Sequence, residues 1–146
     1  MAITQAIANA FKKQLLEGDQ NFKSSGGDKF KLALYTSSAT LNSATTAYAS
    51  TNEVANTGTY TAGGDPLAGQ NTSIASGVAI VDFADLSFTG VTLTARGALI
   101  YNTSSAVTNA AVAVLNFGAD KTATSGTFTI QFPAFTTAAA ILRISG

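Results

Sequence analysis

The feature that most constrains the fold is a hydrophobic pattern of period two that begins at Phe30. Phe30, Leu32 and Leu34 alternate with residues of another face, as they do in a strand with one buried side. No helix-length pattern separates the later apolar runs. The predicted strands are Phe30–Tyr35, Val78–Phe83, Val91–Arg96, Ala98–Tyr101, Ala111–Phe117, Phe128–Phe132 and Ile141–Ile144, with a further short strand around Thr59–Ala62.

Short strands with Gly, Asn and Ser turns between them favour an antiparallel sandwich or barrel. One such turn is expected at Gly118-Ala119-Asp120. The length of 146 residues fits one domain. We therefore predict a mainly β fold over residues 1–146, with a jelly-roll or immunoglobulin-like antiparallel β-sandwich in residues 29–146.

The N-terminus has the pattern of an amphipathic helix. Apolar residues recur at every fourth position there: Ile3, Ile7, Phe11 and Leu15. Thr4 is the expected N-cap and Gly18 the expected C′ residue, which gives a helix within residues 1–18. An isolated helix of this length is marginal in water, so the apolar stripe must be buried on this domain or on a neighbouring subunit.

Residues 36–73 are dominated by Thr, Ser, Ala, Asn and Gly. Tyr60 and Leu67 are the main possible anchors, and Gly63-Gly64-Asp65-Pro66 signals a turn. Such a segment gains little from burial in its own core, while ordering it has an entropic cost. We therefore expect an extended arm that is mobile in the isolated protein and ordered by neighbouring subunits.

Charge is scarce: 11% of the residues are Asp, Glu, Lys or Arg, and the formal net charge is zero. A surface with so few charges favours association. There is no basic stripe, so we expect no nucleic-acid partner. The apolar runs are too short to cross a bilayer, so we expect no membrane partner.

The residue types needed for most catalytic chemistry are missing. The chain has no histidine and no cysteine, which excludes His-based triads, His or thiolate zinc sites and Cys nucleophiles. Asp82 and Asp85 lie three positions apart and are interpreted as polar residues at a strand end; a glycosidase pair and a cation site are the alternatives. We expect no enzyme activity, no catalytic or metal-binding residues and no cofactor.

Arg96 lies in an otherwise apolar and Thr-rich stretch and needs a partner. Asp82, Asp85 and Asp120 are the candidates, and the ion pair is either internal or across a subunit contact. The residues expected at an interface are Ile7, Phe11, Leu15, Tyr60 and Arg96.

Five strings in one order carry a resemblance to a known family: Phe30-Lys-Leu-Ala-Leu-Tyr-Thr36, Tyr60-Thr-Ala-Gly-Gly64, Thr94-Ala-Arg-Gly-Ala-Leu-Ile-Tyr-Asn102, Leu115-Asn-Phe-Gly-Ala-Asp-Lys121 and Gly126-Thr-Phe-Thr-Ile130. From about Phe11 to Ile144 the chain resembles small virion structural proteins of tailed bacteriophages, marine and freshwater phages among them. The resemblance carries over no binding residues.

The resemblance implies a non-enzymatic virion component that is assembled in the host cytoplasm. Its partners would be other phage structural proteins, namely the major capsid protein or neck and tail proteins, and copies of itself in a homo-oligomer. We favour a capsid cement or decoration role over a neck, tail or baseplate position. A second alternative is a glycan-binding β-sandwich module, although the absence of Trp and the presence of only four Tyr count against it.

Overall fold

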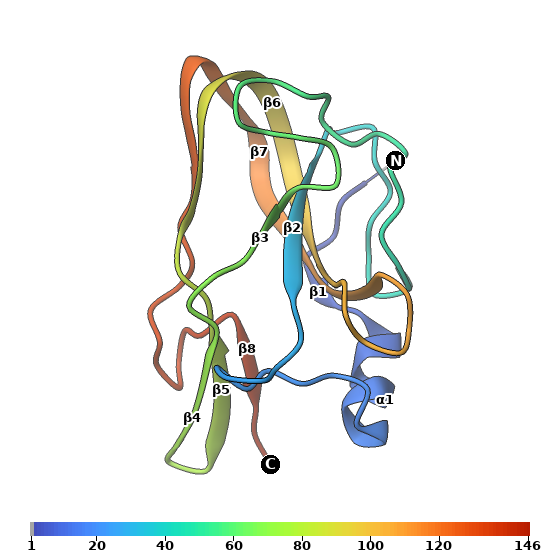
Figure 1. Cartoon of the computed structure of the whole chain (residues 1–146), viewed down its shortest axis with the longest axis vertical. Helices are drawn as coiled ribbons and strands as arrows, with labels where there is room; N and C mark the ends of the chain where they lie inside the picture. The colour runs from blue at the N-terminus through green and yellow to red at the C-terminus, as the bar shows by residue number, and fades with distance from the viewer. Residues whose placement is uncertain (1) are drawn as a thin grey trace.

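The structure, a computed structural model, describes residues 2–146. It is mainly β, with 46% of the residues in strands and 6% in a helix (Figure 1). The elements in chain order are β1 (Ala6–Ile7), α1 (Asn9–Glu17), β2 (Phe30–Tyr35), β3 (Asp65–Pro66), β4 (Asn71–Ala75), β5 (Val78–Asp82), β6 (Leu86–Asn102), β7 (Ala110–Ile130) and β8 (Leu142–Ile144). They form two antiparallel sheets, so the prediction of a mainly β antiparallel fold is confirmed.

The larger sheet has the strand order β1-β7-β6-β2-β3. Its centre is the long hairpin of β6 and β7. Each of these strands is longer than predicted, because β6 joins the two strands expected at 91–96 and 98–101, and β7 joins those expected at 111–117 and 128–132. The turn expected at Gly118-Ala119-Asp120 is wrong, since β7 runs through these residues. Several register shifts interrupt the β6–β7 pairing, as at bulges, and bulges bend a ladder without ending it.

The smaller sheet has the order β4-β5-β8 and occupies the lower end of the molecule in Figure 1. β4 and β5 form a hairpin through Ser76 and Gly77, which have φ values of 51° and 76°. Positive φ at both central positions is the requirement of a type I′ turn. β4 begins in the last residues of the polar segment, and no strand was predicted at its position.

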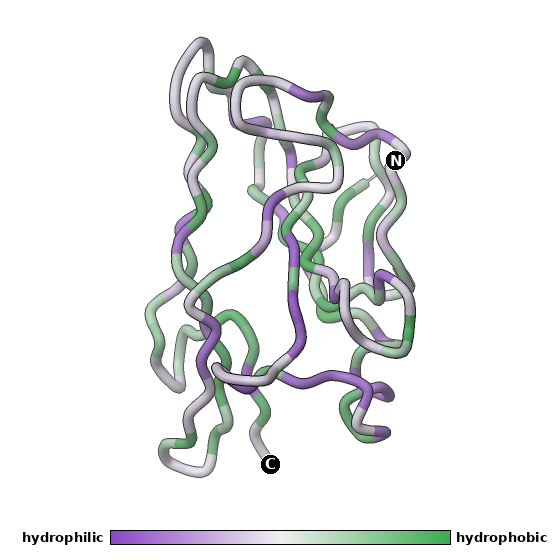
Figure 2. Tube along the Cα trace, in the orientation of Figure 1, coloured by the Kyte–Doolittle hydropathy of each residue, from purple (hydrophilic) through white to green (hydrophobic). Residues whose placement is uncertain are grey.

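The core lies where β2, β6 and β7 are side by side, and Figure 2 shows stretches of hydrophobic residues in this part of the chain. A phenylalanine cluster extends the core downward. The ring of Phe22 stacks on Phe30 with centroids 4.4 Å apart and meets Phe11 of α1 edge-on at 5.8 Å. The ring centroid of Phe83 lies 5.8 Å from those of Phe30 and Phe132. The cluster therefore connects the helix to the residues that flank the small sheet.

The predicted helix is shorter than expected. Helix α1 begins at Asn9, with Ala8 at the N-cap, while Gly18 ends it with φ of 81° as predicted. The N-cap prediction for Thr4 is wrong because the preceding backbone bonds to other segments: Thr4 N–H donates to Leu41 O and Ala8 N–H to Val112 O. Ile3 is therefore buried, and Ile7 partly buried, from extended backbone.

Residues 36–64 fold back on the larger sheet instead of extending away from it. Leu34 of β2 donates its N–H to the Tyr60 hydroxyl and accepts the N–H of Val54 at its carbonyl. On the opposite edge, Tyr48 N–H donates to Asn109 O at the start of β7. The segment thus covers both edges of the sheet within one chain, whereas neighbouring subunits were expected to order it; its mobility in the isolated protein stays a prediction.

Candidate functional site

An apolar groove of about 980 Å³ lies between α1 and the small sheet. Helix residues Phe11, Leu15 and Leu16 line one side. The other side is lined by apolar residues of β4, β5 and β8: Ile74, Ala79, Val81, Leu142 and Ile144. The pairing register puts these five on one face of the small sheet, because Ile74, Ala79 and Ile144 lie in one cross-strand row and Val81 and Leu142 pair two positions away.

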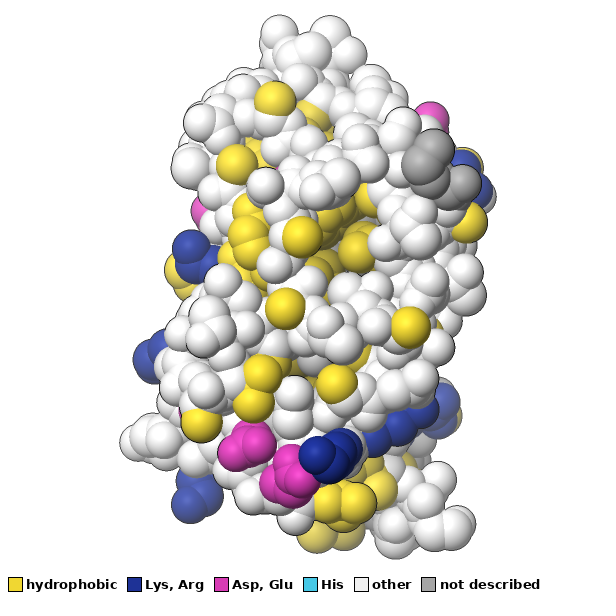
Figure 3. All heavy atoms as spheres, turned by 90° about the vertical axis from the view of Figure 1, so that its right-hand side faces the viewer, with side chains coloured by type: hydrophobic (Ala, Val, Ile, Leu, Met, Phe, Trp, Pro, Cys, Tyr) yellow, Lys and Arg dark blue, Asp and Glu magenta, His cyan; other side chains and the backbone are white. Residues whose placement is uncertain are grey.

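Large hydrophobic side chains are exposed in this groove. Leu16 is 91% exposed, Ile74 78% and Ile144 60%, and these are the exposed large hydrophobic residues of the part of the chain that the structure describes. All three line the same groove. Figure 3 shows the helix side of this end, where hydrophobic and charged side chains lie next to one another at the bottom of the molecule.

Three of the five residues expected at an interface lie at this groove. Phe11 is 3% exposed and packs on Phe22, whereas Ile7 and Leu15 are partly buried against the core. Their side chains are thus largely covered by this chain, and the predicted stripe belongs to the groove wall. Sequence reasoning missed Leu16 and Ile74, although each is a large apolar residue in a polar context.

Tyr60 lies elsewhere, in the core beside β2, and is 1% exposed. Its hydroxyl accepts the N–H of Leu34 at 2.8 Å and donates to Oε1 of Glu53 at 2.8 Å. Its expected place at an interface is wrong for this fold, because the side chain is covered by its own chain.

Arg96 pairs with Asp120 at 3.8 Å, and the two side chains are 37% and 52% exposed. Of the two readings of Arg96, the structure thus shows an internal ion pair across β6 and β7. An exposed pair at this distance contributes little stability, because solvent screens it.

The tyrosines gather around Glu53. Besides Tyr60, the Tyr48 hydroxyl donates to Glu53 Oε2 at 2.6 Å, and the N–H of Gly63 donates to Oε1. The Tyr101 hydroxyl donates to the carbonyl of Gly63, and its ring stacks on Tyr48 at 4.7 Å. Burial, with the charge of Glu53, raises the pKa of Tyr101 to about 12. Burial and Glu53 also raise the pKa values of the Tyr35, Tyr48 and Tyr60 hydroxyls. These bonds fasten the loop, and the cluster is structural.

A second polar network anchors the loop between α1 and β2. Asn102, which is fully buried, donates from Nδ2 to Gln20 Oε1 at 2.8 Å and to Asp28 Oδ2 at 2.7 Å. Gln20 in turn donates to Gln14 Oε1 of the helix at 2.7 Å. These bonds position α1 relative to the large sheet and thereby set one wall of the groove.

Of the two aspartates singled out in the sequence, Asp82 is the last residue of β5 and Asp85 lies between β5 and β6. Asp85 Oδ1 accepts the N–H of Phe132 at 2.8 Å, while Oδ1 of Asp82 is buried without a hydrogen-bond partner. Over residues 2–146 no group of three or more His, Cys, Asp or Glu residues could hold a metal ion. The interpretation as a strand-end residue fits Asp82, whereas Asp85 lies outside the strands and accepts a backbone N–H distant in sequence instead of capping a local turn.

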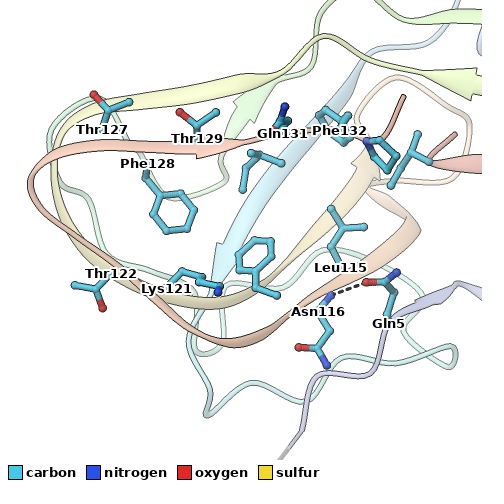
Figure 4. A pocket seen from close by; sticks show the side chains of 14 residues that line it. Gln5, Leu115, Asn116, Lys121, Thr122, Thr127, Phe128, Thr129, Gln131 and Phe132 are labelled. Atoms are coloured by element: carbon cyan, nitrogen blue, oxygen red, sulfur yellow. Dashed lines mark hydrogen bonds between the residues drawn. The ribbon is translucent and has the colours of Figure 1, made fainter. Parts of the chain in front are cut away.

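A smaller hollow of about 480 Å³ lies in the bend of β7 (Figure 4). Phe128 and Leu115 supply apolar surface, and Gln5 and Gln131 supply amide groups. Gln5 Oε1 accepts the N–H of Asn116 at 3.3 Å. The arrangement offers polar groups around a small apolar surface.

In the part of the chain that the structure describes, no helix is long and apolar enough to cross a membrane. Comparison of the sequence with protein-family models and with curated proteins, and of the structure with solved structures, gave no significant match.

Proposed function

We propose that this chain is a non-enzymatic structural component of a tailed-phage virion, and within it a cement or decoration protein of the capsid. Its partners are the major capsid protein and further copies of itself. We also keep the jelly-roll or immunoglobulin-like sandwich as the finer description of the two antiparallel sheets.

The exposure of Leu16, Ile74 and Ile144 in one groove carries this proposal. A contiguous apolar surface on a protein with few charges is typical of an interaction site. The low charge supports the same conclusion, since neither sign of charge opposes contact with neighbours. The resemblance of the sequence strings to phage virion proteins supplies the particular assembly.

The test is the amount of this protein in purified particles of a phage that encodes it, measured by quantitative mass spectrometry. A copy number comparable to that of the major capsid protein supports the shell role. The few copies typical of a ring-shaped component would instead favour the neck, tail or baseplate alternative. Absence from purified particles would overturn the virion proposal.

Two matched variants test the groove. Leu16→Asp places a carboxylate at a side chain that is 91% exposed, so folding should be unaffected while incorporation into particles decreases. Thr124→Asp adds the same charge at an exposed position of β7 away from the groove and should be incorporated normally. Equal incorporation of both variants would exclude the groove as the contact surface.

The hollow in β7 favours a second candidate function, binding of a glycan. Side-chain amides next to an apolar surface can hydrogen-bond the hydroxyl groups of a sugar while the apolar surface packs on its ring. A glycan array probed with the purified protein tests it, with Gln131→Ala as the variant that should reduce any signal. Absence of signal on the array would remove this candidate.

A further inference from the structure

The edge of β4 differs from the other sheet edges of this molecule. β3 is two residues long and ends in Pro66, and β1 is also two residues long. β8 carries Arg143, and the part of β7 beyond β1 carries Asp120 and Lys121. Short strands, Pro and charges are the means by which proteins prevent edge-to-edge pairing.

β4 has none of these protections. Its sequence, Asn-Thr-Ser-Ile-Ala, is uncharged and free of Pro, and all five residues are exposed. The pairing with β5 shows no register shift, so no bulge turns the edge away. In Figure 1 the hairpin projects from the lower end of the molecule with β4 on its outer side.

The register defines which backbone groups are free. Ala75 and Val78 flank the two-residue turn, and in such a hairpin this pair exchanges both hydrogen bonds. Because hydrogen-bonded and non-hydrogen-bonded pairs alternate, Ser73 also bonds to β5, whereas Thr72 and Ile74 direct their N–H and C=O groups to the open edge. In agreement, the N–H of Thr72 does not bond to β5: it donates to its neighbour's side-chain oxygen, Asn71 Oδ1, at 2.9 Å, a bond that would be exchanged when another strand pairs with this edge.

We propose that a second copy of this chain pairs its β4 with this β4, antiparallel, about a two-fold axis that passes at Ser73. Thr72 of each copy then lies opposite Ile74 of the other copy. The outward-facing N–H and C=O groups of these residues form four hydrogen bonds between the two edges, and the Thr72 N–H exchanges its bond to Asn71 for one of them. The two small sheets become one continuous sheet with both apolar faces on the same side.

A second copy is the occupant that this edge fits best. A two-fold contact needs a surface that complements itself, and an uncharged strand with its free groups placed symmetrically about one residue meets that condition. The net charge of zero removes repulsion between copies. Pairing also covers part of Ile74, the more exposed of the two exposed isoleucines in the groove. A single strand pair is small beside the roughly 800 Å² per partner of a standard interface, so we expect a weak dimer in dilute solution.

This inference names the contact by which the proposed assembly protein meets its own copies, and rests on that function. It is tested on the purified chain by cysteine crosslinking. The chain has no native cysteine, so Ser73→Cys introduces a single thiol. At the proposed axis its Cα lies about 4.5 Å from the Cα of its equivalent, the spacing of a non-hydrogen-bonded pair and within disulfide range. Ala75→Cys, on the same strand and face, would be about 14 Å from its equivalent and is the matched control.

Under mild oxidation we expect Ser73→Cys to form a covalent dimer at least ten times faster than Ala75→Cys. Ser73→Lys should weaken dimerisation of the purified chain in analytical ultracentrifugation, because it sets two ammonium groups opposite each other, and Ala75→Lys should do so less. Equal crosslinking of the two cysteine variants, or none in either, would overturn the proposed pairing. The virion proposal is decided separately, by the copy number in particles.

Discussion

The bond between Tyr60 and Leu34 is the most direct test of why residues 36–64 are ordered without a neighbour. Tyr60→Phe removes one hydroxyl and changes little in volume. The hydroxyl serves both Leu34 N–H and Glu53 Oε1 at 2.8 Å each, and Tyr60 and Leu34 are 1% and 0% exposed. A bond to a charged group contributes about 1.5–3 kcal/mol, and a buried donor left unpaired costs about 1–3 kcal/mol. The low ends together give about 2.5 kcal/mol, which we expect as the minimum loss in the free energy of unfolding.

Urea denaturation of the isolated protein, followed by circular dichroism, measures this loss. Tyr35→Phe is the matched control, because the Tyr35 hydroxyl donates to one carbonyl, Ala49 O at 2.8 Å. That single neutral bond should contribute about 0.5–1.5 kcal/mol. Hydrogen exchange should also show loss of protection at Val54, whose N–H donates to Leu34 O. If Tyr60→Phe destabilises no more than Tyr35→Phe, the reasoning that this hydroxyl fastens the loop is refuted.

Three further perturbations follow from the same structure. The raised tyrosine pKa values mean that the folded state keeps its phenol protons while the unfolded chain loses them above pH about 10. The tyrosine contribution to the free energy of unfolding should therefore be constant below pH about 10 and fall toward pH about 12, by up to about 4 kcal/mol per pH unit for three buried tyrosines. Urea midpoints across that range measure the fall. Gly64→Ala should lower the free energy of unfolding by at least about 2 kcal/mol, because the backbone has φ of 77° and the new Cβ would clash with Leu32 O. Gly77→Ala has a similar φ of 76° but open space around the new Cβ, so it should cost about 1 kcal/mol in the same thermal or urea unfolding assay. Phe11→Ala should cost about 3–5 kcal/mol at a site that is 3% exposed, whereas Leu16→Ala, five residues later in the same helix and 91% exposed, should stay within about 0.5 kcal/mol. Equal melting temperatures for the two variants would contradict the burial of Phe11.

The predictable part of the fold was the part in which side-chain pattern decides the structure. β2 has the predicted bounds, and β5 and β8 lie within their predicted ranges, because each combines apolar residues with period two. β4 was missed because it lacks an apolar pattern, with Ile74 as its one large apolar residue. It is a strand through its hairpin with β5 and has no buried face of its own. Pattern reasoning has no signal for a strand of that kind.

The helix start shows a different limit. The spacing of Ile3, Ile7 and Phe11 fits a helix stripe, yet the first two pack on the core from extended backbone, Ile3 buried and Ile7 partly buried. Backbone hydrogen bonds to residues distant in sequence determine where the helix begins: the N–H of Thr4 donates to the carbonyl of Leu41, and that of Ala8 to the carbonyl of Val112 in β7. The groove was likewise only half predictable, since the helix stripe was visible but its opposite wall depends on β4.

The expected arm failed for a reason that connects the two proposals. A segment with few apolar residues gains little from burial, which favoured ordering by neighbours, but hydrogen bonds to sheet edges supply the ordering within the chain. Val54, Tyr60 and Tyr48 satisfy backbone groups that would otherwise face solvent on both edges of the large sheet. The same polar segment then ends in β4, which has no cover of its own. A chain that uses a long segment to close the edges of one sheet and leaves an uncharged edge open on the other concentrates its capacity for strand pairing at that one place, next to the groove with the exposed leucine and isoleucines.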